Sequence, residues 1–262
     1  MSSPDNHRGW RRLGPERAIV AEALHLGRSA PMSTAIRRLD LGKMHALRRS
    51  AEPRVSWTAL MVRAMGLVSA RRPELRQIYR RFPWPHIYQH DQSVAIVPIQ
   101  REYGGREWLF FARIRTPEEK PLMLLRGVLG HFRDTPVEEI EELRWLRRLA
   151  WAPWPARRLL MWAGYHGPSL FRVRHFGTFA VSSLGHLGAL GLQPPGVVPA
   201  VISCGPVDDE GRCDVALTFD HRLYDGALAV RVLGELEETL NGRLADELRA
   251  SASASAMPTV SK

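Results

Sequence analysis

Three short apolar stretches in the C-terminal half constrain the fold of this chain more than any other feature. They read GTFAVSSLG at 177–185, VVPAVISCG at 197–205 and CDVALTF at 213–219. Each is rich in β-branched or aromatic residues and is bounded by turn residues, which is typical of strands. Two further strands, QSVAIVPI and WLFFARI, flank the dipeptide Gly104-Gly105 and predict a hairpin. We therefore expect these five segments to form a sheet.

Helical patterns occupy the middle of the chain and follow the last strand. SWTALMVRAMGLVSARRP opens with Ser56 as a helix N-cap and ends at Pro73. Thr116 and Thr135 each precede a proline and lie three residues before a glutamate, so two capping boxes are predicted there. A final amphipathic helix is expected to end at Asn241-Gly242.

This order of elements predicts an α+β fold, a two-layer sandwich with helices on one face of a mixed or antiparallel sheet. No long Gly/Ser/Pro linker and no internal repeat interrupts the sequence, so we expect a single domain over residues 17–245. The polar residues 1–16 and the Ser/Ala-rich residues 246–262 are predicted to be disordered tails.

Charge and hydropathy narrow the choice of partners. The formal net charge of +10 comes mainly from arginine, and a basic surface attracts nucleic acid, anionic lipid or a phosphorylated ligand such as coenzyme A. The arginines are scattered and no nucleic-acid-binding signature is present, so nucleic acid is not expected as a partner. No apolar run reaches the ~18 residues that a membrane span needs. The first residues lack the apolar region of a secretory signal, so we expect a cytoplasmic protein.

The two cysteines, Cys204 and Cys213, flank GPVDDEGR, which is predicted to be a hairpin turn. We expect them to face each other across two strands as reduced thiols of a cytosolic protein. Neither has partners at the spacing of zinc ligands, so no metal site is predicted.

The segment TFDHRLYDGA, residues 218–227, connects the last strand to the last helix. His221 therefore lies on a sharp strand-to-helix connection, which can hold a side chain rigidly while it projects into a cleft. Histidine is a natural general base near neutral pH. Asp225 could fix the loop through a hydrogen bond or an arginine pair, and Gly226 allows a close turn into the helix.

Three motifs in the same order resemble the acyltransferase catalytic domain of 2-oxo acid dehydrogenase complexes, a family that includes chloramphenicol acetyltransferase. DHRLYDG resembles its active-site signature, GTFAVSSLGHLG a strand that precedes the histidine, and LQPPGVVPAVISCG the stretch between them. These motifs cover residues 177–242, and weaker similarity extends the span to 17–245. The resemblance implies the chloramphenicol-acetyltransferase-like sandwich.

The resemblance also implies roles for individual residues. His221 would be the general base that deprotonates the acceptor's thiol or hydroxyl, which attacks the thioester carbonyl of an acyl-coenzyme A. Ser182 would donate a hydrogen bond to the tetrahedral oxyanion, and Asp225, in the same signature, would chiefly anchor the histidine loop. In this family the site lies between the subunits of a trimer. The resemblance therefore implies a homotrimer or a higher assembly of trimers, with His221 and Ser182 from different chains.

The sequence departs from the family in its accessory parts. It contains no lipoyl domain, linker or subunit-binding domain, and Lys43, Lys120 and Lys262 lie in no lipoylation context. We therefore expect no covalent lipoyl group on this chain. The acceptor implied is a separate lipoyl protein or a small molecule.

A stretch rich in tryptophan and arginine, residues 143–174, replaces a shorter and more charged helix of the family. It carries four tryptophans and seven arginines, and two prolines divide it into short helices. Two interpretations are open. The segment packs on the domain or on another subunit, with arginine stems over aromatic faces, or it meets lipid or an apolar substrate.

Three functions are consistent with these features of the sequence. The first is an acyl-coenzyme A-dependent acyltransferase that uses His221 and Ser182. The second is a non-catalytic trimeric scaffold of the same fold. The third is a basic protein that associates with a membrane surface or with nucleic acid. The motifs favour the first function.

Overall fold

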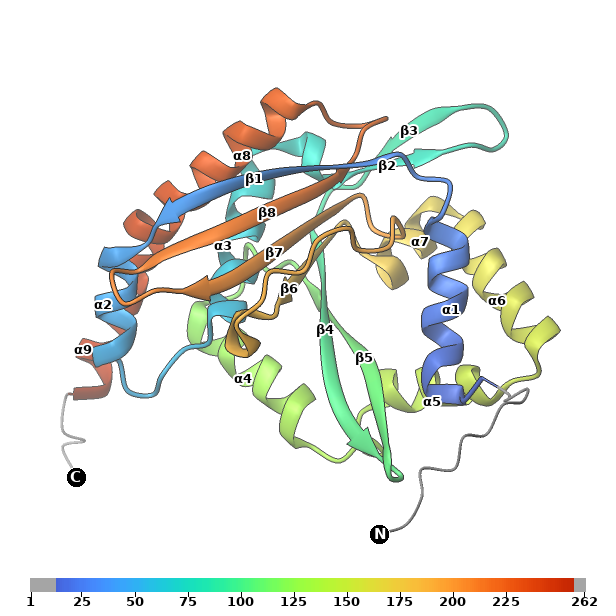
Figure 1. The fold of residues 1–262 in the computed structure, drawn as a ribbon, viewed down its shortest axis with the longest axis horizontal. Helices are drawn as coiled ribbons and strands as arrows, with labels where there is room; N and C mark the ends of the chain where they lie inside the picture. Colours follow the sequence, from blue (N-terminus) through green and yellow to red (C-terminus); the bar gives the residue numbers. More distant parts are fainter. Residues whose placement is uncertain (1–12, 257–262) are drawn as a thin grey trace, which may run out of the picture.

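The computed structural model describes residues 13–256, and its centre is a six-stranded mixed sheet (Figure 1). Pairing between β4 and β6 and between β6 and β7 is parallel, and the remaining pairs are antiparallel. In spatial order the strands are β1 (Met32–Asp40), β8 (Arg212–Asp220), β7 (Ala200–Val207), β6 (Phe179–Ser183), β4 (Val94–Tyr103) and β5 (Arg106–Arg115).

The hairpin expected at Gly104-Gly105 is present. These two glycines connect β4 to β5 with φ angles of +60° and +69°, a left-handed conformation that favours glycine at both positions. A second, smaller sheet consists of β2 (Gln77–Arg80) and β3 (His86–Gln89).

Helices connect and cover the strands. They are α1 (Pro15–Gly27), α2 (Gly42–Ser50), α3 (Trp57–Arg71), α4 (Leu122–Asp134), α5 (Glu141–Trp151), α6 (Trp154–His166), α7 (Ser169–Phe176), α8 (Gly226–Thr239) and α9 (Ala245–Ala256), with short helical turns η1 (Pro73–Arg76), η2 (Gly185–Leu187) and η3 (Leu240–Leu244). In Figure 1, α3 and α8 lie behind the sheet, while α1, α5, α6 and α7 gather at the side of β5.

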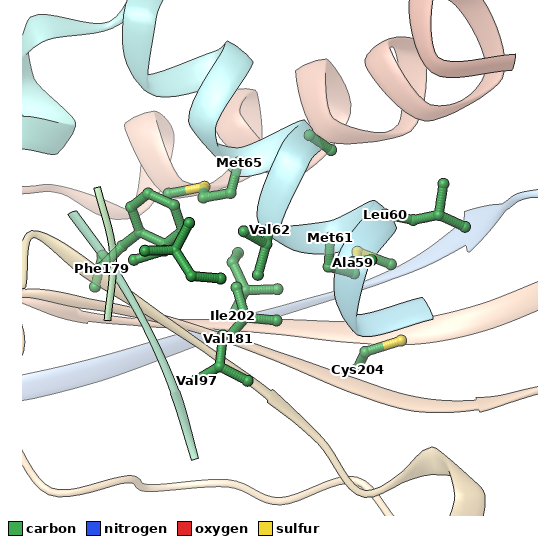
Figure 2. Packing of buried hydrophobic residues seen from close by; sticks show 14 of the residues in the cluster. Ala59, Leu60, Met61, Val62, Met65, Val97, Phe179, Val181, Ile202 and Cys204 are labelled. Carbon is green, nitrogen blue, oxygen red and sulfur yellow. The ribbon is translucent and has the colours of Figure 1, made fainter. Parts of the chain in front are cut away.

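Helix α3 forms the centre of the core. Its N-cap is Ser56, as predicted, since the Ser56 side chain accepts a hydrogen bond of 3.1 Å from the Ala59 amide. Residues 59–69 are all buried. Figure 2 shows Val62 and Met65 of this helix directed toward the sheet residues Phe179, Val181 and Ile202. The predicted α+β sandwich with helices on one face of a mixed sheet is thereby confirmed.

The opposite face of the sheet has its own small cluster. Ile96 of β4, Ala180 of β6 and Val201 of β7 pack there with Val198, which lies in the segment between β6 and β7. Since side chains alternate along a strand, Ser182 of β6 lies on this second face, while Val181 lies in the main core.

Both predicted capping boxes are wrong. Helix α4 begins at Leu122, after a turn in which the carbonyl oxygens of Pro117 and Glu118 accept hydrogen bonds of 3.1 and 2.6 Å from Arg63 of α3. Thr116 itself has a φ of +45°. Helix α5 begins at Glu141, and Thr135 instead ends α4: its hydroxyl is 2.8 Å from the imidazole Nδ1 of His131. The groups of a Thr116 cap are bonded elsewhere: its amide donates to the carbonyl oxygen of Ser93 at 2.9 Å, and its hydroxyl oxygen accepts from Lys120 at 3.2 Å. The contact of Thr135 with His131 is local, four residues back along the chain.

The C-terminal helix is longer than the sequence predicted. The chain passes Asn241-Gly242 through a π-helical turn and continues as α9. Residues 246–256, predicted to belong to a disordered tail, are helical, and Leu248 is buried in the core. Glu247 also pairs with the buried Arg63 at 3.3 Å. These contacts stabilise a helix where the Ser/Ala-rich composition predicted disorder. The remaining residues of the predicted tails, 1–12 and 257–262, lie outside the described residues.

Candidate active site

His221 lies immediately after β8, in the loop that leads to α8 in Figure 1. Its backbone amide donates a hydrogen bond of 2.9 Å to the carbonyl oxygen of Pro31, at the start of β1. Its ring lies 5.7 Å from the ring of Phe219, between centroids. The residue is exposed, so the imidazole is open to a substrate or to a neighbouring protomer.

An ion pair holds the backbone on both sides of this histidine. The Arg222 guanidinium donates to both carboxylate oxygens of Asp220, from Nε at 2.9 Å and from Nη2 at 2.6 Å. Burial acts to lower the pKa of Arg222, but the hydrogen bond and the charge of Asp220 outweigh it and raise that pKa. The same guanidinium lies over the ring of Tyr79, 4.1 Å from its centroid. A well-anchored turn therefore carries His221.

Asp225 is the N-cap of α8. Its carboxylate oxygen Oδ1 accepts a hydrogen bond of 2.7 Å from the Leu228 amide. The sequence left two contacts open for Asp225, a hydrogen bond or an ion pair with an arginine. The structure shows the hydrogen bond, and the arginine pairs with Asp220 instead. No role was predicted from the sequence for Asp220 or Arg222. The opposite charges of these two residues, one before and one after His221, are the signal that could have identified the pair.

Ser182 lies near the end of β6. It is half-buried on the face of the sheet opposite α3, and it is in register with Ser203 of β7. Among the described residues its hydroxyl has no hydrogen-bond partner, so its proton is available to an incoming oxygen acceptor.

The sheet register separates Ser182 from His221 within one protomer. Phe179, Ala200 and Phe219 form one row across β6, β7 and β8. Ser182 lies three positions beyond this row in one direction, and His221, on the antiparallel β8, lies two positions beyond it in the other. At ~3.3 Å per residue, five positions amount to ~17 Å along the strands alone. One protomer therefore does not bring the two side chains together.

No group of three or more His, Cys, Asp or Glu side chains is placed to hold a metal ion in residues 13–256. Within the same part of the chain, no helix has both the length and the apolar character needed to cross a bilayer.

The fold has known counterparts, although no protein-family model and no curated protein matches the sequence. The chain is similar to the dihydrolipoamide acetyltransferase of Azotobacter vinelandii, with 17% identity, a TM-score of 0.65, and 94% of this chain and 98% of the other covered. The truncated catalytic core of the 2-oxoacid dehydrogenase multienzyme complex from Thermoplasma acidophilum gives 17% identity, a TM-score of 0.64, and 90% and 99% coverage.

A third similar structure is the probable dihydrolipoamide acetyltransferase of Listeria monocytogenes, with 16% identity, a TM-score of 0.61, and 90% and 95% coverage. The resemblance inferred from the motifs is thus confirmed as a likeness of fold over most of the chain. In the Azotobacter protein the roles of a serine, a histidine and an asparagine in the catalytic mechanism have been investigated, and that asparagine follows the histidine by four residues. Asp225 follows His221 by the same interval.

Proposed function

We propose that this protein is an acyltransferase that moves an acyl group between coenzyme A and a thiol or hydroxyl acceptor. His221 is the general base, and Ser182 stabilises the oxyanion. The observation that carries the proposal is the exposed His221 on an ion-paired turn between β8 and α8, within the motif DHRLYDG. The shared fold with the acetyltransferase cores supports it.

The reaction needs only these groups and the two substrates. The imidazole of His221 takes the proton of the acceptor's S–H or O–H group as the sulfur or oxygen attacks the thioester carbonyl carbon. The carbonyl oxygen becomes an oxyanion, which accepts a hydrogen bond from the Ser182 hydroxyl. The carbon–sulfur bond to coenzyme A then breaks, and the imidazolium returns the proton to the departing thiolate.

The active unit is a cyclic homotrimer in which His221 of one protomer faces Ser182 of the next. The separation of ~17 Å within a protomer supports this arrangement, because a hydrogen-bonded site requires both groups within about 3 Å of the reacting atoms. Closed cyclic symmetry would repeat the same site at each of the three interfaces. A monomer would then be inactive.

Two classes of acceptor are consistent with the chemistry. One is the dihydrolipoyl group of a separate protein, and the other is a small molecule with a free thiol or hydroxyl. Incubation of the full chain with acetyl-coenzyme A and either dihydrolipoamide or a small alcohol, with the products separated by chromatography, distinguishes them. Transfer to neither acceptor, with acetyl-coenzyme A left intact, would favour the non-catalytic scaffold.

Substitution of the two residues tests the mechanism. Ser182→Ala should reduce kcat by about 10²–10³ through loss of one oxyanion donor. His221→Ala should reduce it by about 10²–10⁴ through loss of the base. Activity that is unchanged in His221→Ala would remove this mechanism.

Mixing the two inactive variants tests the shared site. If each site takes His221 from one protomer and Ser182 from the next, every mixed trimer contains one intact site. Unfolding and refolding an equal mixture should therefore restore about a quarter of the wild-type activity, since three quarters of random trimers are mixed and each has one site of three. Refolding each variant alone is the control. A mixture no more active than its components would show that the two residues do not share a site between protomers.

A further inference from the structure

Helix α6 presents apolar side chains to solvent. Leu159, Leu160 and Trp162 are 64%, 58% and 51% exposed. At helical spacing they form, with their exposed neighbours, one continuous stripe, here called the α6 stripe: Pro155, Ala156, Leu159, Leu160, Trp162 and Ala163. The buried residues Met161, Gly164 and Tyr165 occupy the inner side of the helix. A surface helix normally places polar residues outside, so this stripe lacks its partner.

The arginines of α6 do not cover the stripe. Arg157 turns back toward α5, where its Nη1 donates to the carbonyl oxygens of Ala150 and Ala152, both at 3.1 Å. Arg158 lies over the ring of Trp154, 5.6 Å from its centroid, and hydrogen-bonds to His25 of α1. The side chains of these two arginines therefore do not cover Leu159 and Leu160. Arginines of this segment do cover aromatic faces, as one interpretation expected: Arg147 lies over Tyr103, Arg158 over Trp154 and Arg172 over Tyr165. Among the described residues, no such contact involves Leu159, Leu160 or Trp162.

Exposed apolar residues also occur on the preceding helix α5 and on the following helix α7. Trp145 and Trp151 of α5 are exposed, as are Leu170 and Phe171 of α7. Trp154, at the start of α6, is exposed as well. Tryptophans around a leucine-rich stripe are typical of helices that lie in a membrane interface.

The charge of this region distinguishes between two partners for the α6 stripe, a second copy of this chain and an anionic membrane. Segment 143–174 contains seven arginines and no aspartate or glutamate, and Glu141 and Glu142 directly precede it. Arg172 is buried and Arg157 lies 3.9 Å from Glu22, while the other five arginines are at least partly exposed. A pocket of about 690 Å³ where α6 meets α1 is lined by two arginines, Arg157 and Arg158, and one carboxylate, Glu22. A second copy of this surface would oppose like charges. An anionic bilayer offers an apolar interior for the stripe and negative headgroups for the arginines.

We infer that α6 docks this protein on the surface of an anionic membrane, with Leu159, Leu160 and Trp162 inserted among the acyl chains. The helix lies in the plane of the interface. Thirteen residues at 1.5 Å each give ~20 Å, less than the ~30 Å of the hydrocarbon core. The exposed Arg148 and Arg174 lie on the flanking helices α5 and α7, where they can meet lipid phosphates.

Flotation of the full chain with vesicles tests this inference. Vesicles of equal parts phosphatidylcholine and phosphatidylglycerol should carry the protein, and vesicles of phosphatidylcholine alone should carry much less. Added salt should weaken the association, because part of it is electrostatic. Leu159→Ser/Leu160→Ser should lower the partition coefficient about a hundredfold, since each leucine contributes about a factor of ten.

A matched variant controls for general loss of surface hydrophobicity. Leu124→Ser/Val230→Ser removes two side chains that are each 52% exposed but lie on α4 and α8, and it should bind vesicles as the wild type does. Circular dichroism should show both variants folded, because the substituted side chains are exposed.

Three results would overturn the inference. These are failure of the wild type to bind anionic vesicles, equal binding by the α6 double variant, and an equal loss in the matched control. A change in sedimentation mass of Leu159→Ser/Leu160→Ser without loss of vesicle binding would assign the stripe to contact between copies instead. None of these measurements depends on acyl transfer.

Discussion

Arg222 and Asp220 form a bidentate ion pair across His221, with nitrogen–oxygen distances of 2.9 and 2.6 Å. The Arg222 amide also donates to Asp220 Oδ1 at 3.1 Å, so the pair closes a tight turn with the histidine at its apex. Asp220 is buried and Arg222 is partly exposed. The backbone that carries the imidazole is therefore held by residues that do not themselves carry out a proton transfer.

Removing only the arginine should destabilise the fold. Arg222→Met leaves the buried Asp220 carboxylate without its charged partner, and the free energy of unfolding should fall by about 3 kcal/mol. Urea denaturation at neutral pH measures this change. The double variant Asp220→Asn/Arg222→Met leaves no buried charge and should lose less stability. A single variant as stable as the wild type would show that the pair contributes nothing to folding.

Asp225 should behave as a helix cap. Asp225→Ala removes the acceptor of the Leu228 amide and should cost about 1 kcal/mol of unfolding free energy. Asp225→Asn should retain both stability and acyl transfer, because an amide oxygen accepts the same hydrogen bond. Loss of activity in Asp225→Asn at unchanged stability would instead require the carboxylate charge.

Stability should fall as the pH drops through about 6.5. Burial and the nearby charges of Arg172 and Arg80 lower the pKa of His166 from its ordinary value of 6.5. Burial and neighbouring arginines also lower the pKa of His175. Below pH 6.5 the unfolded chain binds protons before the folded chain does, so acid favours unfolding.

Urea midpoints measured from about pH 7.5 to about pH 5.5 report this dependence. His166→Asn should flatten part of the slope, because the group that titrates differently in the two states is gone. A midpoint that rises as the pH falls would contradict the assignment.

The cysteines should be unreactive in the folded protein. Their sulfur atoms lie 3.3 Å apart and both residues are buried. The hydrogen bond with Cys213 and burial raise the pKa of the Cys204 thiol, so its reactive thiolate is scarce. A disulfide-exchange reagent should label neither cysteine under native conditions and both in denaturant. Rapid labelling of the folded chain would show that this region opens readily.

The elements that sequence reasoning predicted correctly depend on local patterns. The Gly104-Gly105 hairpin, the Ser56 cap and the strands at Phe179–Ser183 and Ala200–Val207 follow from turn residues, capping groups and apolar runs. The cap at Thr116 failed for a non-local reason, and the cap at Thr135 for a local one, since Thr135 ends the preceding helix and contacts His131. Arg63, more than fifty residues before Glu118, binds the backbone that the first of these caps would organise.

The sequence by itself determined the fold class and the histidine turn, because alternation along strands, capping and the motif DHRLYDG are properties of neighbouring residues. Only the tertiary structure decided how far Ser182 lies from His221, because that distance depends on the register of three strands. The tertiary structure also decided that the leucines of α6 face solvent while Arg157 faces α5. A helix with apolar residues on both sides can pack either way, and the contacts of its neighbours determine which side is buried.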